Sequence, residues 1–265
     1  MSLSRNALIA SSAGRPLTAR SVLASVLLGT EPPWLPTPRL LRTAALFGIS
    51  EGSARTALSR MVANGEAVSE RGGYRLAGRL VARQHRQAAS RRAETRAWDG
   101  TWELVTVEGD GARSAADRAA LRDALRALRL AEVREGVWTR PDNLDPARSP
   151  DARAVAERWC RWWTGARPSP APDVGALWDL AAWAAGAEAL RGEMEALLPG
   201  LDAGSPAELA AGFVTSAAVL RHLQHDPLLP PELAPAGWPG EALRADYDRY
   251  DAAFRAVLGP YLAGA

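Results

Sequence analysis

The chain has 265 residues, of which 47% are hydrophobic and 23% are charged. This length favours about two or three domains, and the composition excludes a globally disordered protein. Its single cysteine, Cys160, excludes an internal disulfide framework and a multi-cysteine zinc site. No apolar run reaches the roughly 18 residues of a membrane span, and no signal peptide is evident. We therefore expect a cytoplasmic protein without a membrane partner.

The charge is divided unevenly along the chain. All 32 basic residues are arginine, a bias that, with the abundant alanine and glycine, indicates a GC-rich coding sequence and by itself no function. Residues 1–96 carry 15 arginines and 5 acidic residues, a formal charge of +10, whereas residues 97–265 carry 17 and 25, a formal charge of −8. A strongly basic segment favours polyanions because each neutralised phosphate releases counterions. The division predicts a DNA-binding N-terminal part joined to an acidic part with another task.

Residues 1–17 are rich in small polar residues, and we expect a flexible tail there. Thr18 can cap a first helix, and a second helix is expected over residues 39–47. A third helix follows Ser50 and ends at Asn64-Gly65. Its periodicity predicts a buried stripe of apolar residues: Ala54, Ala57, Leu58, Met61 and Val62. The opposite face consists of arginines and small hydroxyl residues: Ser53, Arg55, Thr56, Ser59 and Arg60.

Two short alternating segments, residues 66–70 and 73–76, flank Arg71-Gly72-Gly73 and predict a β-hairpin with a Gly-Gly turn. Three helices followed by a hairpin indicate a winged helix-turn-helix domain over residues 18–78. In this interpretation, six residues contact DNA: Ser53, Arg55, Thr56, Ser59, Arg60 and Arg71. The alternative is that this helix-turn-helix serves as a protein–protein module.

The rest of the chain predicts three further regions. Residues 79–97 form a basic linker helix. Residues 98–168 open with strand, helix, strand and strand, which is typical of a ferredoxin-like α/β domain. Within that range the tryptophan-rich stretch around Cys160 is expected to be helical, with the cysteine packed inside. A proline-rich hinge then leads to a helical C-terminal domain over residues 173–265, whose last helix is expected to stop at Gly259-Pro260. The predicted fold class is α+β.

Three groups of motifs, in this order along the chain, resemble the PaaX family of bacterial repressors of phenylacetic acid degradation. They are residues 19–21 with 48–62, residues 98–102 with 136–141, and residues 226–233 with 238–240. The resemblance implies that the middle domain is similar to the ferredoxin-like fold of a small CRISPR-associated endonuclease. It also implies a dimeric repressor that an aryl-CoA thioester releases from operator DNA, phenylacetyl-CoA in the founding case. The chain departs from the family in its arginine-only, alanine-rich composition and in a short linker helix.

The ten tryptophans suggest a pocket for the effector. Trp138 and Trp162 could line a site for an aromatic acyl group, with Arg140 or Arg161 facing a CoA phosphate, although core packing is the simpler role for these indoles. His85, His222 and His225 are the only histidines. His222 and His225, three residues apart, could offer two ligands to one metal, but no acidic or cysteine partner lies one turn away in a matching pattern, so we expect no metal site and no cofactor. No catalytic motif is present, and we do not expect an enzyme.

The sequence therefore predicts a homodimeric repressor that binds a double-stranded DNA operator and responds to a small effector, possibly an acyl-CoA. Two alternatives remain open. In the first, the middle domain is a metal-dependent nuclease that uses Asp110, which follows the first strand of that domain in a Gly-Asp-Gly turn. In the second, the chain is a DNA-binding scaffold without a ligand.

Overall fold

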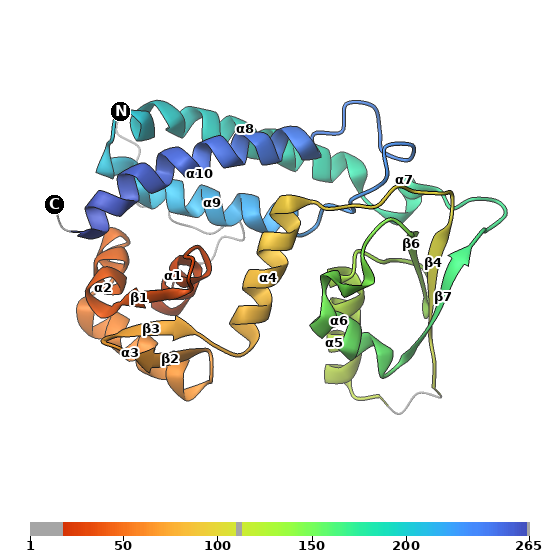
Figure 1. The fold of residues 1–265 in the computed structure, drawn as a ribbon, viewed down its shortest axis with the longest axis horizontal. Helices are drawn as coiled ribbons and strands as arrows, with labels where there is room; N and C mark the ends of the chain where they lie inside the picture. Colours follow the sequence, from red (N-terminus) through yellow and green to blue (C-terminus); the bar gives the residue numbers. More distant parts are fainter. Residues whose placement is uncertain (1–17, 110–112, 264–265) are drawn as a thin grey trace. The chain divides into compact units, whose positions relative to one another are not determined.

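The computed structural model describes residues 18–109 and 113–263 (Figure 1). The expected flexible tail, residues 1–17, lies outside the described residues. The fold is of the α+β class, with two small antiparallel sheets and a helical C-terminal region. The chain forms two compact units. Of the described residues, unit 1 comprises 18–87, 188–221 and 241–263, and unit 2 comprises 88–109, 113–187 and 222–240.

Unit 1 begins with three helices, α1 (Ala19–Leu28), α2 (Thr37–Leu46) and α3 (Glu51–Ala63). The predicted N-caps are confirmed, because Thr18 accepts a hydrogen bond from the amide of Ser21 and Ser50 accepts one from that of Ser53. The predicted buried stripe of α3 is correct except for Val62, whose side chain is 38% exposed. A helix buries only the part of its apolar stripe that a neighbour covers, so the inner face of α3 is narrower than the pattern suggests.

A three-stranded antiparallel sheet completes this part of unit 1. Its strands are β1 (Trp34–Pro36), β2 (Ala67–Glu70) and β3 (Gly73–Leu76), in the order β1-β3-β2. The sequence predicted the two hairpin strands but not β1, which precedes α2.

The hairpin turn is shorter than predicted. Arg71 and Gly72 alone form it, with φ values of 50° and 72°, which is the conformation of a two-residue type I′ turn. Gly73 is the first residue of β3, and a Cβ atom there would lie 2.3 Å from the carbonyl oxygen of Leu35 in β1. The second glycine is therefore required for the close approach of β1 and not for the turn.

The remaining helices of unit 1 come from α8 (Leu180–Asp202), α9 (Leu209–Leu223) and α10 (Gly240–Ala263). A short 3-10 helix, η3 (Pro206–Glu208), precedes α9. Arg191 of α8 forms an ion pair of 2.6 Å with Asp246 of α10, and the hydroxyl of Tyr250 in α10 donates to the carbonyl of Gly212 in α9.

The expected stop at Gly259-Pro260 is wrong, because α10 continues through Pro260 to Ala263. Beyond the proline, Leu262 is buried, and its carbonyl accepts a hydrogen bond of 2.9 Å from Arg42 of α2. Figure 1 shows this end of α10 beside α2. Tertiary contacts therefore offset the hydrogen bond that the proline cannot donate.

Unit 2 contains a four-stranded antiparallel sheet. Its strands are β4 (Trp102–Val107), β5 (Ala131–Arg134), β6 (Val137–Pro141) and β7 (Cys160–Ala166), in the order β5-β6-β4-β7. Two helices, α5 (Ala115–Ala127) and α6 (Pro150–Glu157), cover one face of the sheet (Figure 1). Buried residues of the sheet and of both helices form the core beneath them: Val105, Leu121, Leu125, Leu130, Trp138 and Ala156.

The tryptophan-rich stretch around Cys160 was expected to be helical, and this is wrong: it forms strand β7. In the register with β4, Trp162 lies opposite Val105 and Trp163 lies opposite Leu104. Neighbours along a strand point to opposite faces, so Trp162 packs against the core whereas Trp163 is exposed. Indole and β-branched side chains are enriched in strands, and the edge of β4 supplies the backbone partners.

Three elements remain: α4 (Arg79–Arg92), a short 3-10 helix, η2 (Pro146–Arg148), between β6 and α6, and α7 (Val174–Leu177), between β7 and α8. α4 is the predicted basic helix, and it starts in unit 1 and ends in unit 2. Among the described residues, no helix has both the length and the apolar character that a membrane span requires.

Candidate nucleic-acid interface

The outward face of α3 is fully accessible. All five residues predicted on this face, Ser53, Arg55, Thr56, Ser59 and Arg60, are exposed. The hydroxyl of Thr56 donates to the carbonyl of Gly52, and the hydroxyl of Ser53 bonds to that of Ser50. These short side chains therefore stay close to the helix, and the arginines project beyond them.

The two arginines of α3 differ in their partners. Arg55 forms an ion pair of 2.7 Å with Glu51, one turn earlier on the same helix. Arg60 has no hydrogen-bond or ion-pair partner among the described residues. A guanidinium without an internal partner keeps all its donors for an external anion.

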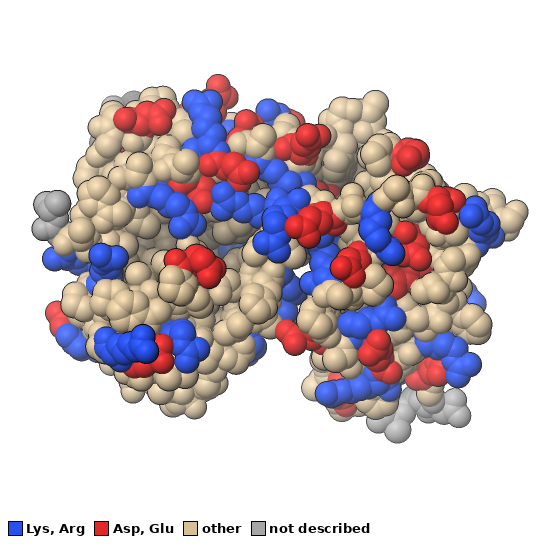
Figure 2. Space-filling view, viewed as in Figure 1, with Lys and Arg blue, Asp and Glu red and all other residues tan. Residues whose placement is uncertain are grey.

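The hairpin adds a further exposed arginine. Arg71 occupies the tip of the turn, with a positive φ of 50°, and its side chain is exposed. On the neighbouring strands, Arg75 forms an ion pair of 2.8 Å with Glu70. On the face drawn in Figure 2, acidic and basic side chains are interspersed over both units.

A buried carboxylate, which sequence reasoning missed, holds α3 in place. Glu66 follows the end of α3 and is 1% exposed, and both of its oxygens accept hydrogen bonds from Arg20 of α1, at 2.7 and 2.5 Å. Arg79, at the start of α4, also pairs with it. The Arg20 hydrogen bonds, with those of Arg79, lower the pKa of Glu66 to about 2. One ionised side chain thus joins α1, the end of α3 and the start of α4.

The residues predicted for effector binding lie in and around the sheet of unit 2. Trp138 is 3% exposed in the core, and Trp162 is half-buried, with the guanidinium of Arg153 3.8 Å from the centroid of its ring. Arg161 points to the opposite face from Trp162 and pairs with Glu108 at 2.6 Å. The structure therefore separates Arg161 from the two indoles.

Arg140 is buried to 1% exposure. Its guanidinium donates to the carbonyls of Pro141 and Leu128 and, at 2.6 Å, to the side chain of Asn143. Burial lowers its pKa to about 10. The cavity beside it measures about 20 Å³, which is room for about one water molecule. In this structure the guanidinium of Arg140 is bonded to acceptors of its own chain inside unit 2, so its charge is not accessible to a ligand.

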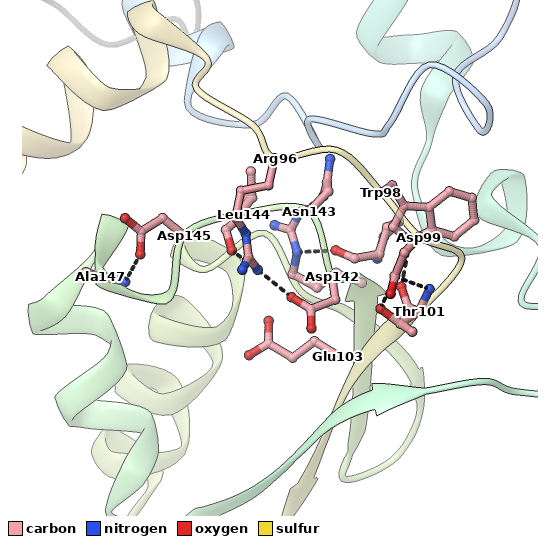
Figure 3. A network of polar contacts seen from close by, with 12 residues as sticks. Arg96, Trp98, Asp99, Thr101, Glu103, Asp142, Asn143, Leu144, Asp145 and Ala147 are labelled. Carbon is pink, nitrogen blue, oxygen red and sulfur yellow. Dashed lines mark hydrogen bonds and ion pairs between the residues drawn. The ribbon is translucent and has the colours of Figure 1, made fainter.

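Figure 3 shows the polar network around this region. Arg96 donates to the carboxylate of Asp142 at 2.8 Å and to the carbonyl of Leu144 at 2.7 Å. Asp99 accepts from the amide and hydroxyl of Thr101. The amide of Asp142 donates to the carbonyl of Thr101, which connects the motif of residues 98–102 to the end of β6. These motif residues thus have a structural role in closing the sheet.

Asp110, the candidate acid of a nuclease, lies outside the described residues. Residues 18–109 and 113–263 contain no group of three or more potential metal ligands. His222 stacks on Trp183, and its Nε2 lies 2.9 Å from the carbonyl oxygen of that residue. Burial raises the pKa of the Cys160 thiol to about 11, which favours the protonated form at neutral pH.

The fold and the site define a mixed α+β protein that presents an exposed, arginine-bearing helix. Three family models match it in order: PaaX-like protein over residues 18–80, PaaX protein central Cas2-like domain over residues 95–157, and PaaX-like protein C-terminal domain over residues 178–263. The chain therefore belongs to the PaaX-like family. Membership indicates a transcriptional regulator that acts on DNA.

Among solved structures, the chain is similar to the uncharacterized protein Rv0674 from Mycobacterium tuberculosis. The two are 43% identical, with a TM-score of 0.69, and the alignment covers 92% of this chain and 98% of that chain. No curated protein shows a significant match.

Proposed function

We propose that the chain is a homodimeric repressor that binds a pseudo-palindromic operator through a winged helix-turn-helix. In each protomer α3 enters the major groove, which is wide enough for an α-helix. Arg55 and Arg60 contact bases or phosphates, whereas Ser53, Thr56 and Ser59 seat the helix against the backbone. Arg71, at the tip of the hairpin, anchors the wing.

The observation that carries this proposal is the state of Arg60. Its side chain is exposed on a helix face that is otherwise made of small polar residues, and it has no internal partner among the described residues. The surrounding segment, residues 1–96, has a formal charge of +10. Contact with DNA would therefore cost no internal ion pair at this position and would release counterions from phosphate.

The topology of unit 2 supports a ferredoxin-like middle domain. Strand, helix, strand, strand, helix and strand follow one another from β4 to β7, and the sheet order places β4 and β6 at its centre. We propose that this domain and the helical C-terminal region respond to a small effector, an aryl-CoA or related acyl-CoA, whose binding relieves repression.

The test of DNA binding compares two arginine variants. Arg60→Ala should weaken binding by roughly 1–3 kcal/mol, about 5- to 150-fold, because a contact to a base edge or phosphate is lost. Arg249→Ala, which removes an exposed arginine from α10, is the matched control and should bind as the wild type does. Fluorescence anisotropy at fixed salt, with duplexes selected by the wild-type chain from a random pool, measures both. An unchanged affinity in Arg60→Ala would contradict the assignment of α3.

The same duplexes test the rest of the proposal. Addition of phenylacetyl-CoA or another acyl-CoA should release them from the protein, and a flat response across aromatic and aliphatic thioesters would contradict the effector role. Incubation with magnesium or manganese should leave the duplexes intact. Cleavage that disappears in Asp110→Ala would instead establish a nuclease.

A further inference from the structure

A hollow of about 610 Å³ opens in unit 2, away from the indoles that the sequence indicated. Residues 175–181, from α7 to the first turn of α8, and Ala184 line one side of it, and the loop of residues 235–239 lines the other. Small-molecule sites in proteins typically measure about 300–1,000 Å³ and are lined mainly by apolar and aromatic side chains. This hollow therefore has the size of a ligand site.

Trp238, which lines the hollow on the loop side, is the outer ring of a ladder of three aromatic rings. The indole of Trp238 stacks on that of Trp183, and Trp183 stacks on the imidazole of His222, with ring centroids 4.6 Å apart in both pairs. The interplanar angles are 19° and 25°, so the three rings are nearly parallel. Trp238 is the outer ring, and it lines the hollow.

Polar contacts fix the inner rings of this ladder. The indole nitrogen of Trp183 donates to the carbonyl of His222, while Nε2 of His222 contacts the carbonyl of Trp183. Gly186 of α8 makes room for the imidazole, because a Cβ there would lie 2.7 Å from its Cε1 atom. The ladder is thus built into the packing of α8 and presents a preorganised aromatic surface, which limits the entropy lost when a ligand binds.

The charge of the residues that line the hollow restricts which ligands it can bind. Of the lining residues, all of which the structure describes, Asp179 alone carries a charged side chain. Its Oδ1 accepts a hydrogen bond of 3.0 Å from the amide of Ala182, at the start of α8. A carboxylate or phosphate inside the hollow would meet this negative charge and no cationic side chain, whereas a neutral aromatic ring would lose little on desolvation.

We propose that this hollow binds the aromatic ring of a neutral ligand, with the charged part of any CoA carrier remaining outside it. The ligand is an arylacyl amide or thioester, and the free aryl carboxylate is rejected. This inference rests on the proposed effector response and assigns its site.

The first test fills the hollow. Ala181 is exposed and lines it, so Ala181→Leu should occupy part of its volume without burying a new group in the core. Ala185→Leu, also exposed on α8 but outside the lining, is the matched control. Calorimetric titration with phenylacetamide and phenylacetyl-CoA should give affinities about tenfold or more lower in Ala181→Leu, because the added side chain occupies space that the aromatic ring would fill, and unchanged affinities in Ala185→Leu. Wild-type affinity in Ala181→Leu would overturn the proposal.

The second test changes only the charge. Asp179→Asn keeps an oxygen that can cap α8, so it preserves the fold. In the wild type, phenylacetate should bind at least about tenfold more weakly than phenylacetamide, and Asp179→Asn should narrow this difference. Equal binding of acid and amide to the wild type would overturn the proposal.

Operator binding, measured in parallel, separates this inference from the proposed function. If the operator binds but no aromatic probe does, the inference fails and the DNA-binding role stands. If phenylacetyl-CoA releases DNA equally from the wild type and Ala181→Leu, the effector role stands and the site is wrong. If aromatic probes bind in an Ala181-dependent way but no duplex is selected, the site stands and the repressor is wrong.

Discussion

The arginines of α3 and the arginine at the end of β6 occupy opposite environments. Arg60 is exposed and has no partner among the described residues, whereas Arg140 is 1% exposed and donates to three acceptors of its own chain. In the interior a guanidinium must satisfy its donors locally, because desolvation of an unpaired charge is costly. At the surface the same group can keep its donors for another molecule. Arginine content therefore indicates DNA binding only where burial is also known.

The largest expected effect concerns the buried arginine. Arg140→Ala should lower the free energy of unfolding by about 3–5 kcal/mol, because it creates a cavity and leaves the acceptors of Leu128, Pro141 and Asn143 unsatisfied. Arg161→Ala, which breaks only an exposed ion pair, is the control and should change it by less than about 1 kcal/mol. Denaturant unfolding of the full chain checks both. If Arg140→Ala and Arg161→Ala had the same free energy of unfolding, the buried arginine would contribute no more to stability than the exposed one.

The exposed arginine of α3 should show the reverse behaviour. Beyond the loss of affinity, Arg60→Ala should reduce the slope of log affinity against log salt concentration by about 1, because one phosphate contact is lost. Its unfolding free energy should stay within about 0.5 kcal/mol of the wild type. Anisotropy titrations at four salt concentrations and a denaturant curve measure these quantities. A large loss of stability with an unchanged slope would make Arg60 structural.

The pairs around Glu66 are an intermediate case, because a buried carboxylate meets two accessible arginines. The folded-state pKa of Glu66 is lowered to about 2. Its stabilisation is therefore present above the unfolded pKa of about 4.3 and is lost as the pH falls toward 2. Glu66→Gln should remove about 1–2 kcal/mol at pH 7, a value reduced by solvent at Arg20 and Arg79, and should flatten the loss of stability between about pH 4.3 and 2. Melting temperatures of the wild type and Glu66→Gln across this pH range test the prediction. If both proteins lose stability equally between about pH 4.3 and 2, the ion pairs of Glu66 do not stabilise the fold.

The smallest expected effect is on the other arginine of α3. Glu51 neutralises Arg55 at 2.7 Å. Glu51→Gln should strengthen DNA binding by roughly 0.3–1 kcal/mol, because it frees Arg55 and removes a negative charge that would face phosphate. Anisotropy measures the gain, which should vanish in the double variant Glu51→Gln/Arg55→Ala. Weaker binding by Glu51→Gln alone would show that the pair presents Arg55 in its active geometry.

Local signals were sufficient for much of unit 1. Ser50 and Gly65 mark the ends of α3, and the period of its apolar residues separates the buried face from the exposed one. The hairpin also follows from alternation along the chain. These signals act within a few residues, so a single sequence contains them.

In other segments, tertiary contacts override the structure that the local sequence pattern predicts. The stretch of β7 lacks a clear period, and its pairing with β4 decides that it is a strand. Pro260 is a helix breaker, yet the packing of Leu262 and the hydrogen bond from Arg42 keep α10 intact. For the same reason Trp138 and Arg140 were predicted at a ligand site although both are buried in unit 2.

The sequence by itself determined the α+β class, the basic N-terminal part and the exposed arginines of α3, because charge and periodicity are properties of the residue order. Only the tertiary structure decided which arginines are buried, which carboxylate holds α3, and where a hollow forms. The lining of that hollow comes from residues 175–181 and Ala184 on one side and residues 235–239 on the other, about fifty positions apart. Contacts of this separation depend on how distant segments pack, and no short-range pattern records them.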